Sequence, residues 1–205
     1  MNDRASLAVL VSGSGSNLQA ILDAAAEPTY AARVGVVISD RPGVLALERA
    51  AAASVPVEVV AWSSFDTREA FTVAVCDAAE RHGASVLVLA GFMRILSPHA
   101  MVRFPDRIVN IHPALLPAFP GAHAVPQALA HGVRLTGVTV HLVDEKVDHG
   151  PIIYQEAVPV LPGDTEATLH ARIQTVEHRV YPQVVDALAR GAIEVDGRVV
   201  RWEPS

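Results

Sequence analysis

An amide and an imidazole lie two residues apart at the end of an apolar run, in the stretch VNIHPALLP at 109–117. Successive side chains of a β-strand point to opposite faces, so Asn110 and His112 are predicted to project from one face. Pro113 has no N–H to give to a sheet and is predicted to end the strand. Because a buried polar group without a partner costs about 1–3 kcal/mol, this pair indicates a site. Either residue alone is also compatible with a core side chain whose hydrogen bonds are all made within the protein.

A carboxylate that could complete this pair occurs in the stretch VDEKVDHGP, residues 143–151. Asp148 precedes Gly150 and Pro151, which indicate a sharp turn before the next strand. An amide donor, an imidazole that titrates near neutral pH and a carboxylate together supply oxyanion stabilisation and proton transfer. A carboxylate that only caps the turn would give the same pattern.

Small residues fill the loop SGSGSN at 12–17, between an apolar run and a helical pattern. They let backbone N–H groups approach an anion, and the helix that follows adds its positive N-terminal end. The loop lacks the lysine of a Walker A motif, and Leu18 replaces the last glycine of G-x-G-x-x-G. The pattern predicts an anion site, although a tight turn without a ligand would look the same.

A third loop, GFMRILSP at 91–98, combines large apolar residues with Arg94 after a buried run. Such a segment is suited to the wall of a pocket for a flat ligand, or to ordinary packing with a solvated arginine. Ser97 followed by Pro98 predicts the start of a helix.

Strands alternate with helices over the first half of the chain, which predicts βαβ units and a parallel sheet. Two adjacent antiparallel strands and a long helix with an apolar stripe are predicted to follow. The predicted fold class is therefore α/β: a Rossmann-like, mostly parallel sheet flanked by helices, with a C-terminal antiparallel extension and long helix. Predicted strands are 7–13, 33–39, 55–61, 84–91, 107–113, 136–144 and 151–160. Predicted helices are 17–26, 44–53, 65–83 and 164–191, before a terminal hairpin at 192–202.

Three local features qualify these elements. Asp66 or Ser64 is predicted to cap the helix at 65–83. Pro182 is predicted to kink or split the long helix. An Asp-Gly pair, residues 196 and 197, is predicted at the turn of the terminal hairpin.

Composition narrows the function classes. The 205 residues are 51% hydrophobic and carry a net charge of −6 with scattered arginines, which argues against nucleic-acid binding. No apolar run reaches the roughly 18 residues of a membrane span, and no signal peptide is evident. The single cysteine, Cys76, excludes an internal disulfide and is predicted to be a packing residue. We expect one domain over residues 1–205, in the cytoplasm.

Six blocks of sequence, in this order, closely resemble the folate-dependent glycinamide ribonucleotide transformylase family. The blocks are VLVSGSGSNLQAIL, FDTREAF, VLAGFMRILSP, VNIHPALLPAFPGAHA, GVTVHLVDEKVDHGPIIYQEAVPV and ARIQTVEHRVYP. The resemblance covers Leu7 to about Leu188. It implies a formyltransferase fold, with a phosphate-binding half at 1–105 and a catalytic, folate-binding half at 106–205.

The resemblance implies transfer of a formyl group from 10-formyltetrahydrofolate, the co-substrate, to the amine of glycinamide ribonucleotide in purine biosynthesis. No metal and no covalent enzyme intermediate are expected. The small-molecule substrates are the only partners implied, with the chain as a monomer or homodimer. The implied catalytic residues are Asn110, His112 and Asp148. The implied ribonucleotide site is Gly13, Ser14, Gly15, Ser16, Asn17, Arg68, Pro113 and Glu177. The implied folate wall is Met93, Arg94, Ile95 and Leu96, with Val143, Asp144, Glu145, Lys146 and Val147.

The resemblance also implies a mechanism. Asn110 donates to a tetrahedral oxyanion, and His112 stabilises it as an imidazolium whose pKa the nearby Asp148 raises. Asp148 helps to move a proton from the amine to the leaving nitrogen.

The chain departs from the family pattern at two places. Val125 and Pro126 replace the second histidine and the arginine of an H-x-H-R motif, which leaves His123. His149 replaces a glycine that is common beside the catalytic carboxylate. His141 is expected to be a hydrogen-bonded strand residue rather than a third catalyst.

Several alternatives use a similar core. Methionyl-tRNA formyltransferase adds a C-terminal domain and formyltetrahydrofolate hydrolase adds an N-terminal one, and 205 residues are expected to leave no room for either. A catalytically silent nucleotide-binding protein is the alternative from another class. The phosphate loop together with Arg68 favours a phosphorylated small substrate.

Overall fold

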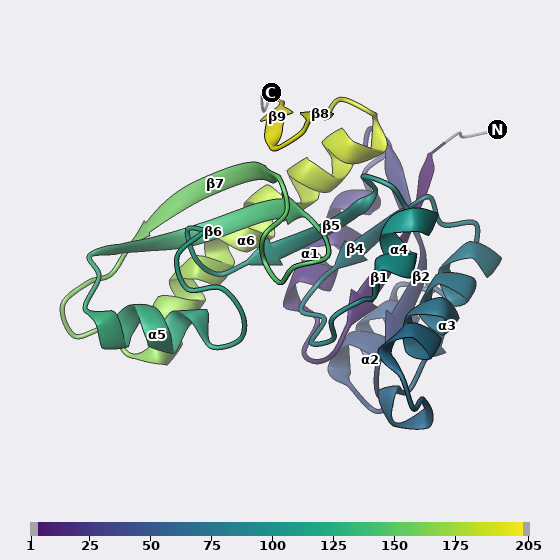
Figure 1. Cartoon of the computed structure of the whole chain (residues 1–205), viewed down its shortest axis with the longest axis horizontal. Helices are drawn as coiled ribbons and strands as arrows, with labels where there is room; N and C mark the ends of the chain where they lie inside the picture. The colour runs from purple at the N-terminus through teal and green to yellow at the C-terminus, as the bar shows by residue number, and fades with distance from the viewer. Residues whose placement is uncertain (1–3, 203–205) are drawn as a thin grey trace.

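The computed structural model describes residues 4–202, with a seven-stranded sheet at its centre. The strand order is β3-β2-β1-β4-β5-β6-β7 (Figure 1). The first five strands are parallel to one another, β6 pairs antiparallel with β5, and β7 pairs antiparallel with β6. The strands are β1 (Ala5–Val11), β2 (Ala32–Ser39), β3 (Val57–Val59), β4 (Val86–Leu89), β5 (Ile108–His112), β6 (Leu135–Leu142) and β7 (Ile152–Pro159). The predicted α/β class and its antiparallel extension are confirmed.

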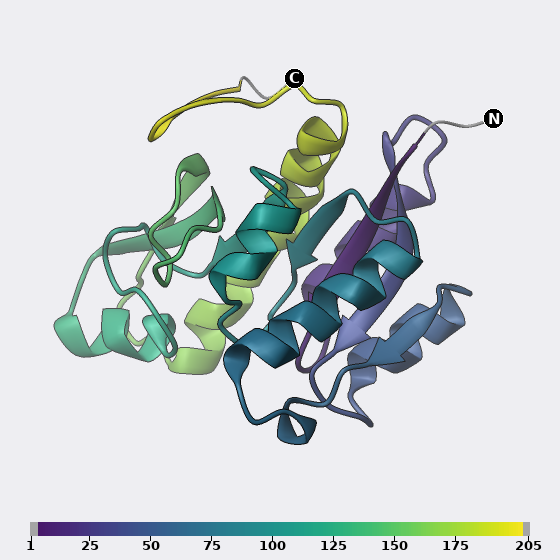
Figure 2. The ribbon, with the colours of Figure 1, turned by 45° about the vertical axis from the view of Figure 1, so that its right-hand side comes forward.

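Helices cover both faces of the sheet (Figure 2). They are α1 (Ser16–Ala25), α2 (Leu45–Ala52), α3 (Arg68–Arg81), α4 (Pro98–Arg103), α5 (Ala124–His131) and α6 (Glu166–Ala189), with a 3-10 turn at Trp62–Ser64. The terminal hairpin pairs β8 (Glu194–Asp196) with β9 (Val199–Arg201), so its turn is Gly197 and Arg198 rather than Asp-Gly. No helix within residues 4–202 is both long and apolar enough to cross a membrane.

Each face of the sheet has its own apolar core, and β1 shows how one strand serves both. Leu7, Val9 and Val11 pack with α1, α2 and α6, whereas Ala8 and Leu10 pack with α3 and α4. All five side chains are fully buried. A strand covered on both faces has no polar side, which is why its sequence is a continuous apolar run.

The strand order places a ligand crevice at the carboxyl ends of the central strands. The chain leaves β1 toward β2 on one side, and β4 then pairs with β1 on the other. In parallel α/β sheets, ligands bind at the carboxyl ends of the strands where the order reverses in this way. The loops after β1 and β4 leave the sheet at this point, next to the end of β5.

The N-cap of α3 differs from the prediction. Helix α3 follows Thr67, whose side-chain oxygen accepts the Ala70 N–H at 3.1 Å. Thr67, and not Asp66 or Ser64, is therefore the cap. Ser64 is unavailable because it ends the 3-10 turn that precedes the helix.

Helix α6 runs through Pro182 as one element, so the predicted split is wrong. Side chains around the proline hold this part of the helix in place. The Tyr181 hydroxyl donates to the carbonyls of Leu89 and Val109 at 2.8 and 3.0 Å, and the Tyr30 hydroxyl donates to the Pro182 carbonyl at 2.9 Å. These bonds tie the helix to β4, to β5 and to the segment between α1 and β2.

Candidate active site

Three polar side chains that are distant in sequence converge at the end of β5. Asn110 and His112 project from the same face of the strand, as the period of two predicts. Asp148 lies between them: its Oδ1 is 3.4 Å from Asn110 Nδ2, and its Oδ2 is 3.3 Å from His112 Nδ1. The predicted convergence of amide, imidazole and carboxylate is confirmed, whereas their catalytic roles remain predictions.

The backbone around Asp148 is specialised to present its carboxylate. Asp148 has a left-handed conformation, with φ of 50°. The Gly121 N–H donates to Asp148 Oδ2 at 2.7 Å. At Gly150, an added Cβ would lie 1.9 Å from the Leu142 carbonyl oxygen, so only glycine lets the loop close onto β6. Left-handed backbone in a non-glycine residue is sparsely populated and clusters at functional sites.

A second histidine contacts this cluster. His141 lies opposite Asn110 in the antiparallel pairing of β5 and β6. Its Nε2 is 3.2 Å from Asn110 Nδ2 and 3.6 Å from Asp148 Oδ1. His141 is a hydrogen-bonded strand residue, as expected, but its contact with the site was not predicted from the sequence. The signal was available, since side chains directly opposite on paired strands share one face.

Burial and charge act in opposite directions on His112, which is 4% exposed. Burial lowers the pKa of the imidazole, and this outweighs the nearby Asp148 carboxylate and the Phe119 carbonyl, which raise it. The expected effect of Asp148, which raises the His112 pKa, is confirmed, but burial outweighs it and the pKa is lowered overall. The Asp148 pKa is itself lowered: burial raises it, but bonds from His141 and Gly121 and the nearby His112 outweigh burial.

Both ring nitrogens of His112 face oxygen acceptors. Nε2 is 2.8 Å from the Phe119 carbonyl oxygen, and Nδ1 faces Asp148. A neutral ring can satisfy only one of these acceptors, whereas a protonated ring satisfies both. The two acceptors therefore favour the protonated form of His112, whereas burial favours the neutral form.

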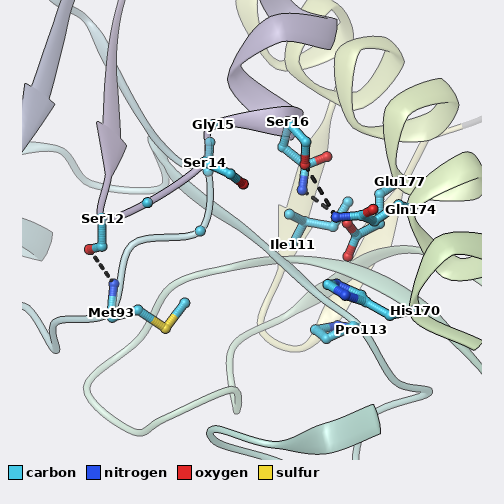
Figure 3. A pocket seen from close by; sticks show the side chains of 14 residues that line it. Ser12, Ser14, Gly15, Ser16, Met93, Ile111, Pro113, His170, Gln174 and Glu177 are labelled. Atoms are coloured by element: carbon cyan, nitrogen blue, oxygen red, sulfur yellow. Dashed lines mark hydrogen bonds between the residues drawn. The ribbon is translucent and has the colours of Figure 1, made fainter. Parts of the chain in front are cut away.

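A pocket of about 310 Å³ opens at the carboxyl ends of β1 and β4, and Figure 3 shows side chains that line it. It includes every predicted ribonucleotide-site residue except Arg68, together with Met93 of the predicted folate wall. Ile111 in β5 and Pro113 just after it line the pocket, so the pocket meets the strand on the face opposite Asn110 and His112. The lining residues are Ser12, Gly13, Ser14, Gly15, Ser16, Asn17, Ala90, Gly91, Met93, Ile111, Pro113, His170, Gln174 and Glu177.

A buried acid lines the far wall of this pocket. Glu177 is 5% exposed and accepts the Asn17 Nδ2 hydrogen at 3.0 Å. Burial raises its pKa, although the Asn17 bond and the nearby His170 lower it. Asn17 Oδ1 is buried and has no hydrogen-bond partner among residues 4–202. Gln174 Nε2 reaches Ser16 Oγ at 3.5 Å, so the loop and α6 meet across the pocket.

The predicted folate wall is partly exposed and partly tied to the protein. Met93 and Ile95 expose 63% and 50% of their surface, while Leu96 is buried. The Arg94 guanidinium donates to Asp40 at 2.6 Å and lies 5.2 Å from the Trp62 ring centre. Its cationic group is therefore already paired.

The loop at 143–149 carries the rest of the predicted folate wall and lies largely in solvent. Val143 packs partly on the core, Asp144 is half-buried, and Glu145, Lys146 and Val147 are exposed. His149 points to Asp144, with its Nδ1 2.6 Å from Oδ2.

The predicted site residue Arg68 and the motif residue His123 lie outside these clusters. Arg68 is exposed at the start of α3 and does not line the pocket, so its predicted phosphate contact stays a prediction. His123 is exposed at the start of α5 and makes no side-chain hydrogen bond with a described residue of the cluster. Pro126 lies in the first turn of α5, where proline is tolerated.

Comparison with known proteins gives matches along most of the chain. The family model described as formyl transferase matches residues 5–185. A phosphoribosylglycinamide formyltransferase of Mycobacterium tuberculosis is 52% identical over 194 residues, which cover 95% of this chain and 89% of the relative. One from Escherichia coli is 42% identical, covering 92% of this chain and 89% of the relative. The crystal structure of glycinamide ribonucleotide transformylase 1 from Symbiobacterium toebii superposes with a TM-score of 0.95 at 46% identity, covering 98% and 95%.

Proposed function

Because the chain belongs to the formyl transferase family, we propose that it transfers a formyl group from 10-formyltetrahydrofolate to glycinamide ribonucleotide. The reaction gives formyl-glycinamide ribonucleotide and tetrahydrofolate, within purine biosynthesis. The names of the two relatives above support this substrate. The observation that carries the proposal is the convergence of Asn110, His112 and Asp148 beside a pocket lined by the small-residue loop.

The pocket suits a ribonucleotide at both ends. The loop at 13–17 offers backbone N–H groups to the phosphate, and the N-terminus of α1 adds partial positive charge. Glu177 and the unpartnered Asn17 Oδ1 offer acceptors to the ribose hydroxyls. The amine then extends past Ile111 and Pro113, around the end of β5, toward Asn110.

The cluster supplies the chemistry of direct transfer. The neutral amine forms a bond to the formyl carbon, and the formyl oxygen becomes an oxyanion to which Asn110 Nδ2 donates. As the negative charge develops, His112 takes up the proton that the amine loses and holds it between Asp148 and the Phe119 carbonyl. The bond from the formyl carbon to the leaving nitrogen then breaks, and His112 passes this proton to the leaving nitrogen, which restores the neutral ring.

The formyl donor requires a second surface on the other side of the cluster. Met93, Ile95 and Leu96 follow β4, and the loop at 143–147 leads into Asp148. The exposed side chains of Met93, Ile95 and Val147 give these segments apolar surface for a flat ring system. Both substrates are small molecules; we place the reaction in the cytoplasm and assign it no metal, nucleic acid or membrane.

A spectrophotometric assay of formyl-folate consumption, with and without glycinamide ribonucleotide, tests this function. We expect consumption only when the ribonucleotide is present, with one formylated product formed for each donor consumed. Consumption without the ribonucleotide would instead indicate a hydrolase. Binding of both ligands with no consumption would indicate a silent binding protein.

A further inference from the structure

Helix α2 donates hydrogen bonds to two successive carbonyl groups of the phosphate loop at 12–17. The Ala46 N–H donates to the Gly13 carbonyl oxygen at 3.1 Å. Arg49 Nε donates to the Ser14 carbonyl oxygen at 2.9 Å, and Arg49 Nη1 donates to Gln19 Oε1 at 3.1 Å. A single side chain therefore joins α2 to the loop and to the first turn of α1.

These two bonds set the direction of the N–H groups that follow. In a trans peptide the C=O and N–H groups point in opposite directions. When α2 holds the carbonyls of Gly13 and Ser14, the N–H groups of Ser14 and Gly15 are turned away from α2. Among residues 4–202, neither N–H has a hydrogen-bond acceptor, and both residues line the pocket. The donors are thus oriented before any anion arrives.

Close packing keeps the loop at the correct distance from α2. Gly15 has φ of 71°, and a Cβ at this position would lie 2.7 Å from Ala46 Cβ and 2.9 Å from Ala46 Cα. Only glycine lets the loop lie this close to the helix. Arg49 can therefore span both contacts from a half-buried position on α2.

We infer that Arg49 is a positioning residue that orients the N–H groups of Ser14 and Gly15 toward the phosphate of the substrate. The inference rests on the proposed function, since it takes a phosphorylated ligand to occupy this loop. Arg49 acts through the loop backbone, from the side opposite the ligand. Its contribution is therefore specific to the phosphate and is not shared by the rest of the substrate.

Calorimetric titration separates this role from general stabilisation. Wild type, Arg49→Met and Arg49→Lys are each titrated with glycinamide ribonucleotide and with the riboside that lacks the phosphate. We expect Arg49→Met to weaken binding of the ribonucleotide about tenfold, as for the loss of one charge-assisted hydrogen bond, and binding of the riboside less than about twofold. Arg49→Lys retains one donor for the Ser14 carbonyl and should give an intermediate affinity.

Two controls separate orientation from simple charge. Arg134→Met removes an exposed arginine at the start of β6 and should leave both affinities unchanged. The ratio of wild-type to Arg49→Met affinity should persist at about 0.5 M salt, because an attraction between exposed charges would be screened there. A ratio that falls to one at high salt, or an Arg49→Lys variant equal to wild type, would overturn the inference.

The outcomes also separate the inference from the function on which it rests. If wild type binds the ribonucleotide no better than the riboside, the phosphate site itself is wrong and the inference falls with it. If wild type prefers the ribonucleotide and Arg49→Met weakens both ligands equally, the function stands and the role of Arg49 is overturned.

Discussion

The proposed phosphate pocket and the proposed catalytic cluster lie on either side of the same strand end but are constructed differently. On its loop side the pocket presents backbone, in a glycine-rich loop held by α2 and α6 at the point where the strand order reverses. The cluster is made of side chains from β5 and β6 and from a loop whose Asp148 has a left-handed backbone. The pocket loop is fixed by the neighbouring helices, and the cluster is fixed by a few polar contacts.

This difference separates binding from turnover. A backbone pocket that is formed in advance gives affinity, and damage to it should raise KM for the ribonucleotide. Side chains that meet the developing charge act on the transition state, and damage to them should lower kcat. Substitutions at Asn110 and Gly15 fall on opposite sides of this division.

The largest effect is expected on turnover, at Asn110. Asn110→Ala removes the proposed oxyanion donor, and such a loss raises the barrier by about 2.7–4 kcal/mol. We expect kcat to fall at least about a hundredfold, with KM for the ribonucleotide changed only slightly. Steady-state kinetics and a thermal melt of the purified variant measure both quantities. Near-normal turnover in a folded variant would remove Asn110 from this role.

A large effect on KM is expected at Gly15. Gly15→Ala forces a Cβ against Ala46 and places alanine in a left-handed conformation, which costs about 1–2 kcal/mol. We expect KM for the ribonucleotide to rise by about tenfold and kcat to fall much less. The Gly15→Ala/Ala46→Gly variant, which removes the facing methyl group, should recover part of the affinity. An unchanged KM would show that the loop does not depend on its contact with α2.

A small effect is expected at His149, in the loop that leads from the catalytic cluster. His149→Gly removes the ion pair between His149 and Asp144. The side chains of both residues are at least one-third exposed, and such exposed pairs stabilise a protein by about 0–1 kcal/mol. KM for the formyl donor should therefore change less than about fivefold, with kcat unchanged. Kinetics with varied donor test this. A tenfold loss of kcat would place His149 within the catalytic cluster.

The smallest effect concerns the pH dependence of stability and comes from Glu177. Burial raises the pKa of this carboxyl above its ordinary value of 4.5, so the folded state holds the proton more tightly than the unfolded state. Its contribution to stability is present below about pH 4.5 and is lost as the pH rises through the folded-state pKa. Glu177→Gln mimics the protonated form, so the unliganded variant should melt higher than wild type at pH 8 and equally at pH 4.

The length of the chain sets how a change in stability appears in the melt. Each 1 kcal/mol corresponds to about 2–4 °C in Tm for a domain of this length. Thermal melts at the two pH values measure the shift. A variant that melts lower than wild type at pH 8 would show that the ionised carboxylate stabilises the unliganded fold.

The two regions also differ in how far the sequence predicts them. The parallel sheet follows from apolar runs such as β1, and the common face of Asn110 and His112 follows from the strand period alone. The position of Asp148 needed the family resemblance, because its turn pattern also fits a simple cap. The Phe119 carbonyl and the Gly121 N–H were not predicted, since backbone contacts depend on loop conformation rather than on residue type.

Contacts between segments distant in the sequence explain two further differences. His141 contacts the cluster only because β6 pairs with β5 in the register that sets it opposite Asn110, and register is a property of two segments together. Pro182 lies inside α6, where hydrogen bonds from Tyr181 to β4 and from Tyr30 to the Pro182 carbonyl hold the helix against the rest of the fold. Local propensity predicts a break there, and tertiary contacts override it.

A double-variant cycle on turnover tests most directly whether the three convergent side chains act together. The kcat for formyl transfer is measured for wild type, Asn110→Ala, Asp148→Asn and the double variant. Because Asp148 contacts both Asn110 and His112, we predict that each single variant loses at least about a hundredfold and that the double variant loses little more than the worse single one. Losses that multiply, or an Asp148→Asn variant with near-normal turnover, would contradict a catalytic centre built from these groups.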